Sequence, residues 1–183
     1  FLRERMKNIL KEKRIRTDII EASISSHNND NFLELYKKTL IMNKFISKEL
    51  GKNAVSTYKR ASNILEQERL ISKDGPDAVL FKEEEEKELF ERINIIRKAF
   101  TVKEERKNYE EHLKLLSDTK LSTDKFFEKV KVNDDNNDIK NNRLELLQIL
   151  CSTFNTFVDF SKLEGSWCLN TCLVLETKKQ KKY

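Results

Sequence analysis

Apolar residues recur every three or four positions along most of this chain, the spacing that places them on one face of an α-helix. This pattern predicts helices over residues 1–13, 17–26, 31–49, 52–71, 83–99, 102–117, 120–131 and 138–160. The chain has 3 Gly, 1 Pro and 37% charged residues, a composition typical of a helix-rich protein. The predicted fold class is therefore all-α, a bundle of about eight helices.

Several side chains lie where a helix is expected to begin or end. An Asn, Asp or Thr oxygen can accept a hydrogen bond from the first helical turn, so plausible N-caps are Thr17-Asp18, Asn31, Thr119 and Asp138. Gly51 is placed where a helix could end with a positive φ angle. These residues support short connections between the predicted helices.

The clearest break in the pattern is Lys73-Asp74-Gly75-Pro76-Asp77. It divides a first helical unit at residues 1–73 from a second at residues 80–165. Residues 166–183 form an apolar, β-prone stretch with a Lys-rich end and no amphipathic pattern. We expect this last segment to be an atypical, poorly ordered tail.

The predicted helix at 52–71 has two contrasting faces when each residue is turned by about 100° around the axis. Its apolar arc of about 120° suits packing against a core and holds Ala54, Val55, Tyr58, Ala61, Ser62 and Leu65. The neighbouring arc is called the polar strip here and holds Lys52, Ser56, Lys59, Arg60, Asn63 and Gln67. The polar strip is either an ordinary solvated face or a surface that binds phosphates and base edges.

Five short segments occur in a fixed order along the chain. They are Phe1-Leu2-Arg3-Glu4-Arg5, Gly51-Lys52-Asn53 through Tyr58-Lys59-Arg60-Ala61-Ser62-Asn63-Ile64-Leu65, Asp124 to Val130, Asn142-Arg143-Leu144, and Asp159 to Gly165. Together they resemble the C-terminal region of bacterial glycyl-tRNA synthetase beta subunits over residues 1–165. From about Phe81 onward the chain is also similar to the all-helical, DALR-type anticodon-binding domain shared with arginyl-tRNA synthetase.

This resemblance implies anticodon recognition within an enzyme that joins glycine to its tRNA using ATP and magnesium. The implied partners are glycine tRNA and a catalytic alpha subunit, in a cytoplasmic heterotetramer of two alpha and two beta subunits. The chain itself is expected to hold no cofactor and to catalyse nothing alone. On this interpretation Lys52, Lys59 and Arg60 contact phosphates, while Asn63 or Gln67 reads an unstacked base.

The formal net charge of +5 is unevenly distributed. Residues 166–183 hold four lysines and one glutamate, a net of +3, which leaves +2 for residues 1–165. Residues 1–16 hold seven basic and two acidic residues, a net of +5. A nearly neutral domain with a basic first helix argues against indiscriminate binding of nucleic acids.

Catalytic and metal-site patterns are weak. The two histidines are His27, in a polar loop, and His112, which we expect at the surface of a charged helix. Three glycines cannot form a glycine-rich phosphate loop. Cys168 and Cys172 lack a second ligand pair, so we expect no metal site, and three cysteines fit a reducing cytosol. No segment approaches the roughly 18 apolar residues of a transmembrane helix.

Four side chains leave their roles open. Arg143 falls within the apolar arc of the last helix, where it could reach solvent by snorkelling, touch tRNA or form a structural ion pair. Phe127 is expected in the core with Val130, and the adjacent Phe126 is the less certain of the two rings. Tyr58 faces the apolar arc and is expected to be buried, with its hydroxyl near the rim.

Two other functions remain compatible with the pattern. The nearer one is the corresponding domain of an arginyl- or cysteinyl-type synthetase. The other is a helical scaffold that holds subunits together without binding RNA, its polar strip merely solvated. Dependence of RNA binding on the anticodon separates all three.

Overall fold

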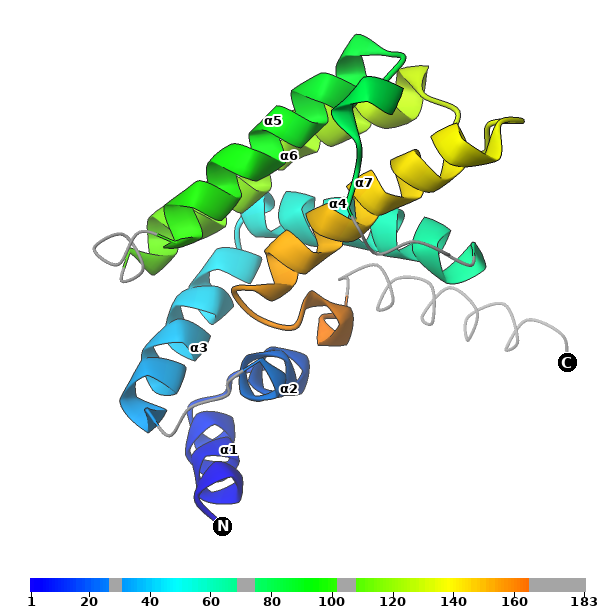
Figure 1. The fold of residues 1–183 in the computed structure, drawn as a ribbon. Helices are drawn as coiled ribbons and strands as arrows, with labels where there is room; N and C mark the ends of the chain where they lie inside the picture. Colours follow the sequence, from blue (N-terminus) through cyan, green and yellow to red (C-terminus); the bar gives the residue numbers. More distant parts are fainter. Residues whose placement is uncertain (27–30, 69–74, 102–107, 165–183) are drawn as a thin grey trace, which may run out of the picture.

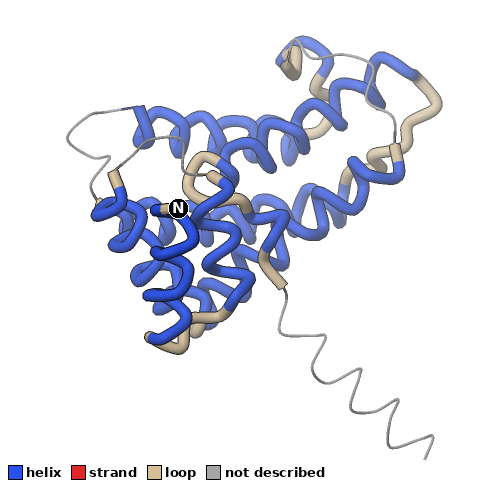
Figure 2. The backbone as a smooth tube through the Cα atoms, turned by 90° about the horizontal axis from the view of Figure 1, so that it is seen from below, coloured by secondary structure: helices blue, strands red, loops and turns tan. Residues whose placement is uncertain are grey.

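The computed structural model describes residues 1–26, 31–68, 75–101 and 108–164. These residues form α1 (Leu2–Glu12), α2 (Thr17–Ser25), α3 (Phe32–Ile46), α4 (Glu49–Gln67), η1 (Ala78–Leu80), α5 (Glu84–Thr101), α6 (Tyr109–Lys129), α7 (Asn137–Asn155) and η3 (Phe160–Lys162). Figure 2 shows helices and loops only in this part of the chain, which confirms the all-α prediction. The predictions for His27, Cys168, Cys172 and the tail at 166–183 lie outside the described residues.

The longest helices form a layered arrangement (Figure 1). Helices α5 and α6 lie antiparallel and side by side, and α7 packs against α5. Helix α4 packs on both α6 and α7, while α2 and α3 contact each other and adjoin η3 and α4 respectively. Helix α1 packs on α2 and α3 at the end of the molecule that carries the N-terminus. Helix α4 thus contacts α3 from the N-terminal part of the described chain and α6, α7 and η3 from its C-terminal part.

One hydrophobic core includes side chains from all seven described α-helices. Its contributors lie on both sides of residues 69–74, so the predicted units at 1–73 and 80–165 share it. The largest fully buried side chains include Phe126, Phe154, Phe157 and Phe160. No described helix combines the length and apolar character needed to cross a bilayer.

The helices predicted at 102–117 and 120–131 are a single helix, α6, over the described residues. Thr119 was expected as an N-cap, but it lies fully buried in the middle of α6 and its hydroxyl donates to the Leu116 carbonyl at 2.6 Å. That bond satisfies the hydroxyl within the helix, so Thr119 does not interrupt it. The N-cap prediction is confirmed for Asn31, whose side chain accepts from the Glu34 N–H at 3.1 Å. Helix α7 is capped by Asn136 rather than by Asp138.

Gly51 does not end a helix as predicted but lies in the first turn of α4. A Cβ atom built on Gly51 would lie 2.2 Å from the Phe45 carbonyl oxygen and 2.6 Å from the Ile46 Cα atom. Glycine is required here because the backbone at the end of α3 approaches α4 this closely. The residue therefore serves a tertiary contact rather than a positive φ angle.

Helix α1 ends in a Schellman motif. The Ile15 N–H donates to the Leu10 carbonyl at 3.3 Å, and the Arg14 N–H donates to the Lys11 carbonyl at 2.8 Å. Arg14 has a φ angle of 58°, a conformation that glycine adopts more easily than arginine. Ile15 and Leu10 are both buried, and their burial holds this turn in place.

The first and last described segments are joined by backbone hydrogen bonds. The Asp159 N–H donates to the Ala22 carbonyl at 3.0 Å. The Glu164 N–H donates to the Asp18 carboxylate at 2.9 Å, and Arg16 Nη2 donates to the Glu164 carbonyl at 2.9 Å. These bonds attach the segment around η3 to α2 and to Arg16, the residue that precedes it.

Replacing Gly51 with alanine should destabilise the fold, since the new methyl group forces the α3 and α4 backbones apart. We expect the free energy of unfolding to fall by about 1–3 kcal/mol, the usual cost of overpacking. Chemical denaturation measures this difference. The matched control is Asn53→Ala in the same helix, which should change stability by no more than about 0.5 kcal/mol. Equal stability of both variants would show that the close approach is unimportant.

Candidate nucleic-acid interface

Helix α4 buries one face and leaves the other in solvent. Its buried residues are Gly51, Ala54, Val55, Thr57, Tyr58 and Ala61. On the polar strip, Ser56 and Lys59 are half-buried, and the exposed members are Lys52, Arg60, Asn63 and Gln67. The structure therefore places the polar strip on the accessible side of the helix, as its sequence pattern indicates.

Tyr58 fixes how α4 is turned toward its neighbours. Its ring centroid lies 6.0 Å from that of Phe154 and 5.6 Å from that of Phe160. Its hydroxyl accepts a hydrogen bond from Asn155 Nδ2 at 3.2 Å, while Asn155 Oδ1 accepts from the Phe160 N–H at 3.0 Å. Burial raises the pKa of the Tyr58 hydroxyl above its ordinary value. The prediction that Tyr58 belongs to the core is confirmed.

Arg60 connects the polar strip to α6. Its guanidinium carbon lies 4.3 Å from the centroid of the Phe127 ring, and Nη1 lies 3.4 Å from Asp124 Oδ1. The side chain keeps 49% of its surface exposed. Arg60 is therefore held against α6 by cation–π and charge contacts, with part of its guanidinium still facing solvent.

Of the two adjacent phenylalanines of α6, Phe126 lies in the core with Val130, so the prediction that Phe127 takes this place is wrong. Phe126 is fully buried, whereas Phe127 is half-buried and partly covered by Arg60. Phe126 shares the inward face with Thr119, Thr123 and Val130, since these positions are three or four residues apart. A rotation of about 100° then turns Phe127 toward α4.

The other candidates of the polar strip have few contacts. Lys52 Nζ lies 3.4 Å from Glu49 Oε2 in an exposed pair. Within the described parts of the chain, the side chains of Lys59, Asn63 and Gln67 form no ion pair or hydrogen bond. Their polar groups are thus available to a ligand along one side of α4.

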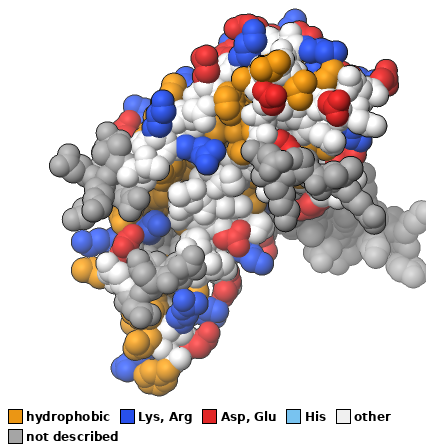
Figure 3. Space-filling view, viewed as in Figure 1, with side chains coloured by type: hydrophobic (Ala, Val, Ile, Leu, Met, Phe, Trp, Pro, Cys, Tyr) orange, Lys and Arg blue, Asp and Glu red, His pale blue; other side chains and the backbone are white. Residues whose placement is uncertain are grey.

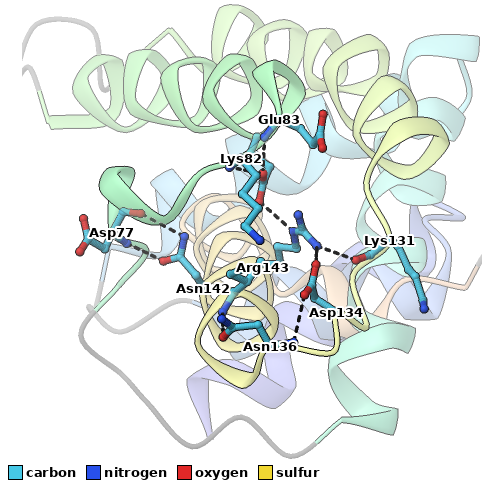
Figure 4. Close-up of polar contacts among 10 residues, drawn as sticks. Asp77, Lys82, Glu83, Lys131, Asp134, Asn136, Asn142 and Arg143 are labelled. Atoms are coloured by element: carbon cyan, nitrogen blue, oxygen red, sulfur yellow. Dashed lines mark hydrogen bonds and ion pairs between the residues drawn. The ribbon is translucent and has the colours of Figure 1, made fainter.

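Arg143 is buried rather than exposed (Figure 4). Its Nε donates to Glu86 Oε1 at 2.9 Å, and its Nη1 donates to Asp134 Oδ2 at 2.8 Å and to the Lys131 carbonyl at 2.9 Å. Only 4% of the side-chain surface is exposed. Of the three alternatives for Arg143, the structure shows the structural ion pair. Burial leaves no surface for snorkelling or for contact with a phosphate or base, so Arg143 is removed from the candidate tRNA contacts.

Glu86 explains why an arginine is needed at this point in the core. Its side chain is fully buried, and Oε2 accepts from the Lys82 N–H at 2.9 Å and from the Glu83 N–H at 2.8 Å. The carboxylate thereby caps the beginning of α5, and Arg143 supplies the compensating charge. One ion pair therefore joins the starts of α5 and α7.

His112 is also buried, contrary to the surface position predicted. Its ring centroid lies 4.3 Å from that of Phe100, and only 2% of the residue is exposed. His112 shares a face of α6 with the buried residues Leu116 and Thr119, at spacings of four and three residues. The charged residues around it occupy the other face of α6, which misled the sequence-based prediction.

The basic first helix is separate from the polar strip. Helix α1 packs on α2 and α3, and Lys7 Nζ lies 3.0 Å from Glu21 Oε1 and 3.5 Å from Glu4 Oε1. In the view of Figure 3, lysine and arginine side chains lie in small groups with acidic side chains between them. The described residues on this face therefore form no continuous basic patch.

A groove of about 490 Å³ lies beside the polar strip, between α4 and α7. Its apolar lining comes from Tyr58, Leu65 and Cys151, and its polar lining from Ser62, Glu66, Gln148, Ser152, Asn155 and Thr156. Burial raises the pKa of the Cys151 thiol to about 12, so this thiol is neutral. The recurrence of polar residues at 148, 152 and 156 was visible in the sequence, but recognising a groove also required α4 as its second wall.

The sequence of this part of the chain matches a known protein family. The family described as the DALR anticodon binding domain matches residues 54–161, which extend from α4 to η3. The chain belongs to the DALR anticodon-binding domain family. The match includes residues 54–67 of α4, which hold the polar strip except Lys52, and both walls of the groove.

Curated relatives of this DALR domain carry the name glycine–tRNA ligase beta subunit. One from Ruegeria sp. is 30% identical over 171 residues, which cover 90% of this chain and 25% of the relative. Another from Rhodospirillum centenum is 32% identical over 170 residues, covering 90% and 24% respectively. A third, from Dinoroseobacter shibae, is 28% identical over 169 residues. The chain thus spans about a quarter of the length of these relatives.

Removing the Arg143 side chain should destabilise the domain strongly, since Glu86 would keep a buried charge without a counter-ion. We expect Arg143→Ala to lower the free energy of unfolding by about 3–5 kcal/mol, measured by chemical denaturation. Arg143→Met combined with Glu86→Gln should recover part of this loss, because it leaves no buried charge. An Arg143→Ala protein of unchanged stability would contradict the structural role.

The stability that the Arg143 ion pairs contribute should depend on pH through the carboxyl group of Asp134. The pKa of its carboxyl group is lowered mainly by a backbone hydrogen bond from Asn136, with a further contribution from Arg143. The stabilisation is therefore complete above the unfolded-state pKa of about 3.9 and is lost as the pH falls through the lower folded-state pKa. The difference in unfolding midpoint between the wild type and Asp134→Asn should stay constant from about pH 5 to 8 and shrink below about pH 4. A difference that keeps its size down to about pH 3 would contradict this role of Asp134.

Proposed function

We propose that this chain reads the anticodon of glycine tRNA as part of a glycine–tRNA ligase beta subunit. The observation that carries the proposal is the family match over residues 54–161, which contains the polar strip on the accessible face of α4 except for Lys52. The names of the curated relatives support the choice of glycine over another amino acid.

The contacts available on α4 suit two different tasks. Lys59 and Lys52 supply positive charge for phosphates, which positions the RNA without reading its sequence. Asn63 and Gln67 carry amide groups that can donate to and accept from the edge of an unstacked base. Arg60 is already held by Phe127 and Asp124, so it adds charge at a fixed place.

The proposal extends to the complete enzyme, of which this chain is one part. Glycine is joined to tRNA with ATP and magnesium on an alpha subunit, in a cytoplasmic assembly of two alpha and two beta subunits. The chain contributes tRNA recognition to that reaction and holds no ATP, magnesium or catalytic residue of its own. The alpha subunit and glycine tRNA are its proposed partners.

Competition binding with full-length tRNA tests this function. Unlabelled glycine tRNA should compete well, and glycine tRNA with its two anticodon cytosines changed to uracils should compete poorly. A subunit scaffold without RNA binding would show no dependence on the anticodon. A domain that preferred an arginine or cysteine anticodon would belong to one of the other synthetases.

Two substitutions should distinguish contacts that position the tRNA from contacts that recognise its bases. Lys59→Ala should weaken binding of every tRNA alike and reduce the slope of log affinity against log salt by about one. Asn63→Ala should reduce discrimination between cytosine and uracil by about 1–3 kcal/mol. Arg97→Ala, which removes an exposed charge from α5, is the matched control and should change neither quantity. If both α4 variants behave like Arg97→Ala, the polar strip is not the binding face.

A further inference from the structure

The groove between α4 and α7 adjoins the polar strip, and the function proposed above did not use it. Ser62 and Glu66 line the groove from α4. Ser62 lies three residues from Lys59 of the polar strip, and Glu66 lies three residues from Asn63. A nucleotide whose phosphate contacts Lys59 would therefore have its base beside the groove. At about 490 Å³, the groove falls within the size range of small-ligand sites.

The hydroxyl groups that line the groove offer mainly acceptors. Ser62 Oγ donates to the Lys59 carbonyl at 3.2 Å, Ser152 Oγ donates to the Ile149 carbonyl at 2.9 Å, and Thr156 Oγ1 donates to the Ser152 carbonyl at 3.1 Å. Each of these hydroxyl hydrogens is thus occupied by the backbone. The oxygen lone pairs that remain can only accept.

Glu66 adds the one formal charge among the groove residues. Its carboxylate is exposed and has no ion pair within the described parts of the chain. A phosphate would be repelled by Glu66, and neither lysine nor arginine lines the groove to attract one. The groove therefore suits an uncharged group that carries hydrogen-bond donors.

The opposite wall supplies limited donor capacity. Asn155 is fixed in orientation because Oδ1 accepts from the Phe160 N–H and Nδ2 donates to Tyr58. Gln148 is exposed, and its amide can donate to a ring nitrogen or carbonyl of a ligand. Tyr58, Leu65 and Cys151 provide apolar surface for the flat face of such a ligand.

We propose that this groove takes one unstacked cytosine of the anticodon, with the amino group of the base donating to Glu66. Cytosine offers an amino donor where uracil has a carbonyl acceptor, so the acceptor-rich wall favours cytosine. Gln148 supplies the matching donor for the remaining edge of the base. This inference rests on the proposed function, and it assigns base selection to both α4 and α7.

The test compares two fluorescent 17-nucleotide anticodon stem-loops, one with the two glycine cytosines and one with uracils in their place. Fluorescence anisotropy with the complete chain gives the ratio of their dissociation constants. We expect Glu66→Gln to reduce this ratio about tenfold, since glutamine keeps the shape but removes the charged acceptor. Gln148→Ala, on the other wall, should reduce the ratio by a factor of about three to ten.

The ratio is the informative quantity because removing any acidic residue raises affinity for both RNAs. Glu91→Gln is the matched control: it removes the same charge from an exposed position on α5, and its ratio should stay within about twofold of the wild type. All three substituted residues are exposed, so each variant is expected to fold, and the midpoint of thermal unfolding checks this.

The outcomes separate the two proposals. If Glu66→Gln and Gln148→Ala retain the wild-type ratio while Asn63→Ala reduces it, the groove does not select the base and anticodon reading by α4 stands. If the wild-type chain binds both stem-loops equally and full-length tRNA binding is also independent of the anticodon, both proposals fall. A reduced ratio in both groove variants, with Glu91→Gln unchanged, supports the cytosine site.

Discussion

The rotation of α4 about its own axis is the constraint on which the proposed interface depends. Tyr58 sets this rotation, because its ring packs against both Phe154 and Phe160 while its hydroxyl accepts a hydrogen bond from Asn155. In the first turn of the helix, Gly51 permits contact with the α3 backbone that any side chain would prevent. With its first turn and its middle held in this way, α4 turns the polar strip toward solvent and forms one wall of the groove.

Many of the charged side chains serve the fold rather than a ligand. Arg143 compensates Glu86 inside the core, Lys125 contacts Glu88, and Lys140 contacts Glu68. Residues 1–165 carry a net charge of only +2, so unspecific attraction of phosphates is weak. On the proposals above, affinity depends on the cations of the polar strip, and selectivity depends on Asn63, Glu66 and Gln148.

Periodicity in the sequence was enough to predict the helices and the exposed side of α4, since both depend on which residues share a face. Periodicity could not show which residues of other helices pack against each face of a helix. His112 and Arg143 were misplaced because Phe100 and Glu86, which cover or pair with them, come from another helix. Gly51 was misinterpreted for the same reason, since its role depends on the backbone of α3. The groove was missed because its polar wall on α7 becomes a site only when α4 lies opposite.

The hydrogen bonds between the two ends of the chain affect the order of folding. Ala22 meets Asp159, and Asp18 meets Glu164, across 146 residues in the second case. Contacts between such distant residues carry a large loop-closure cost and slow the search for the native state. During synthesis α2 emerges early but has no partner for these groups until η3 has left the ribosome. We therefore expect α2 to reach its native contacts only after the segment around η3 has been synthesised. The fold is then completed in a late, cooperative step.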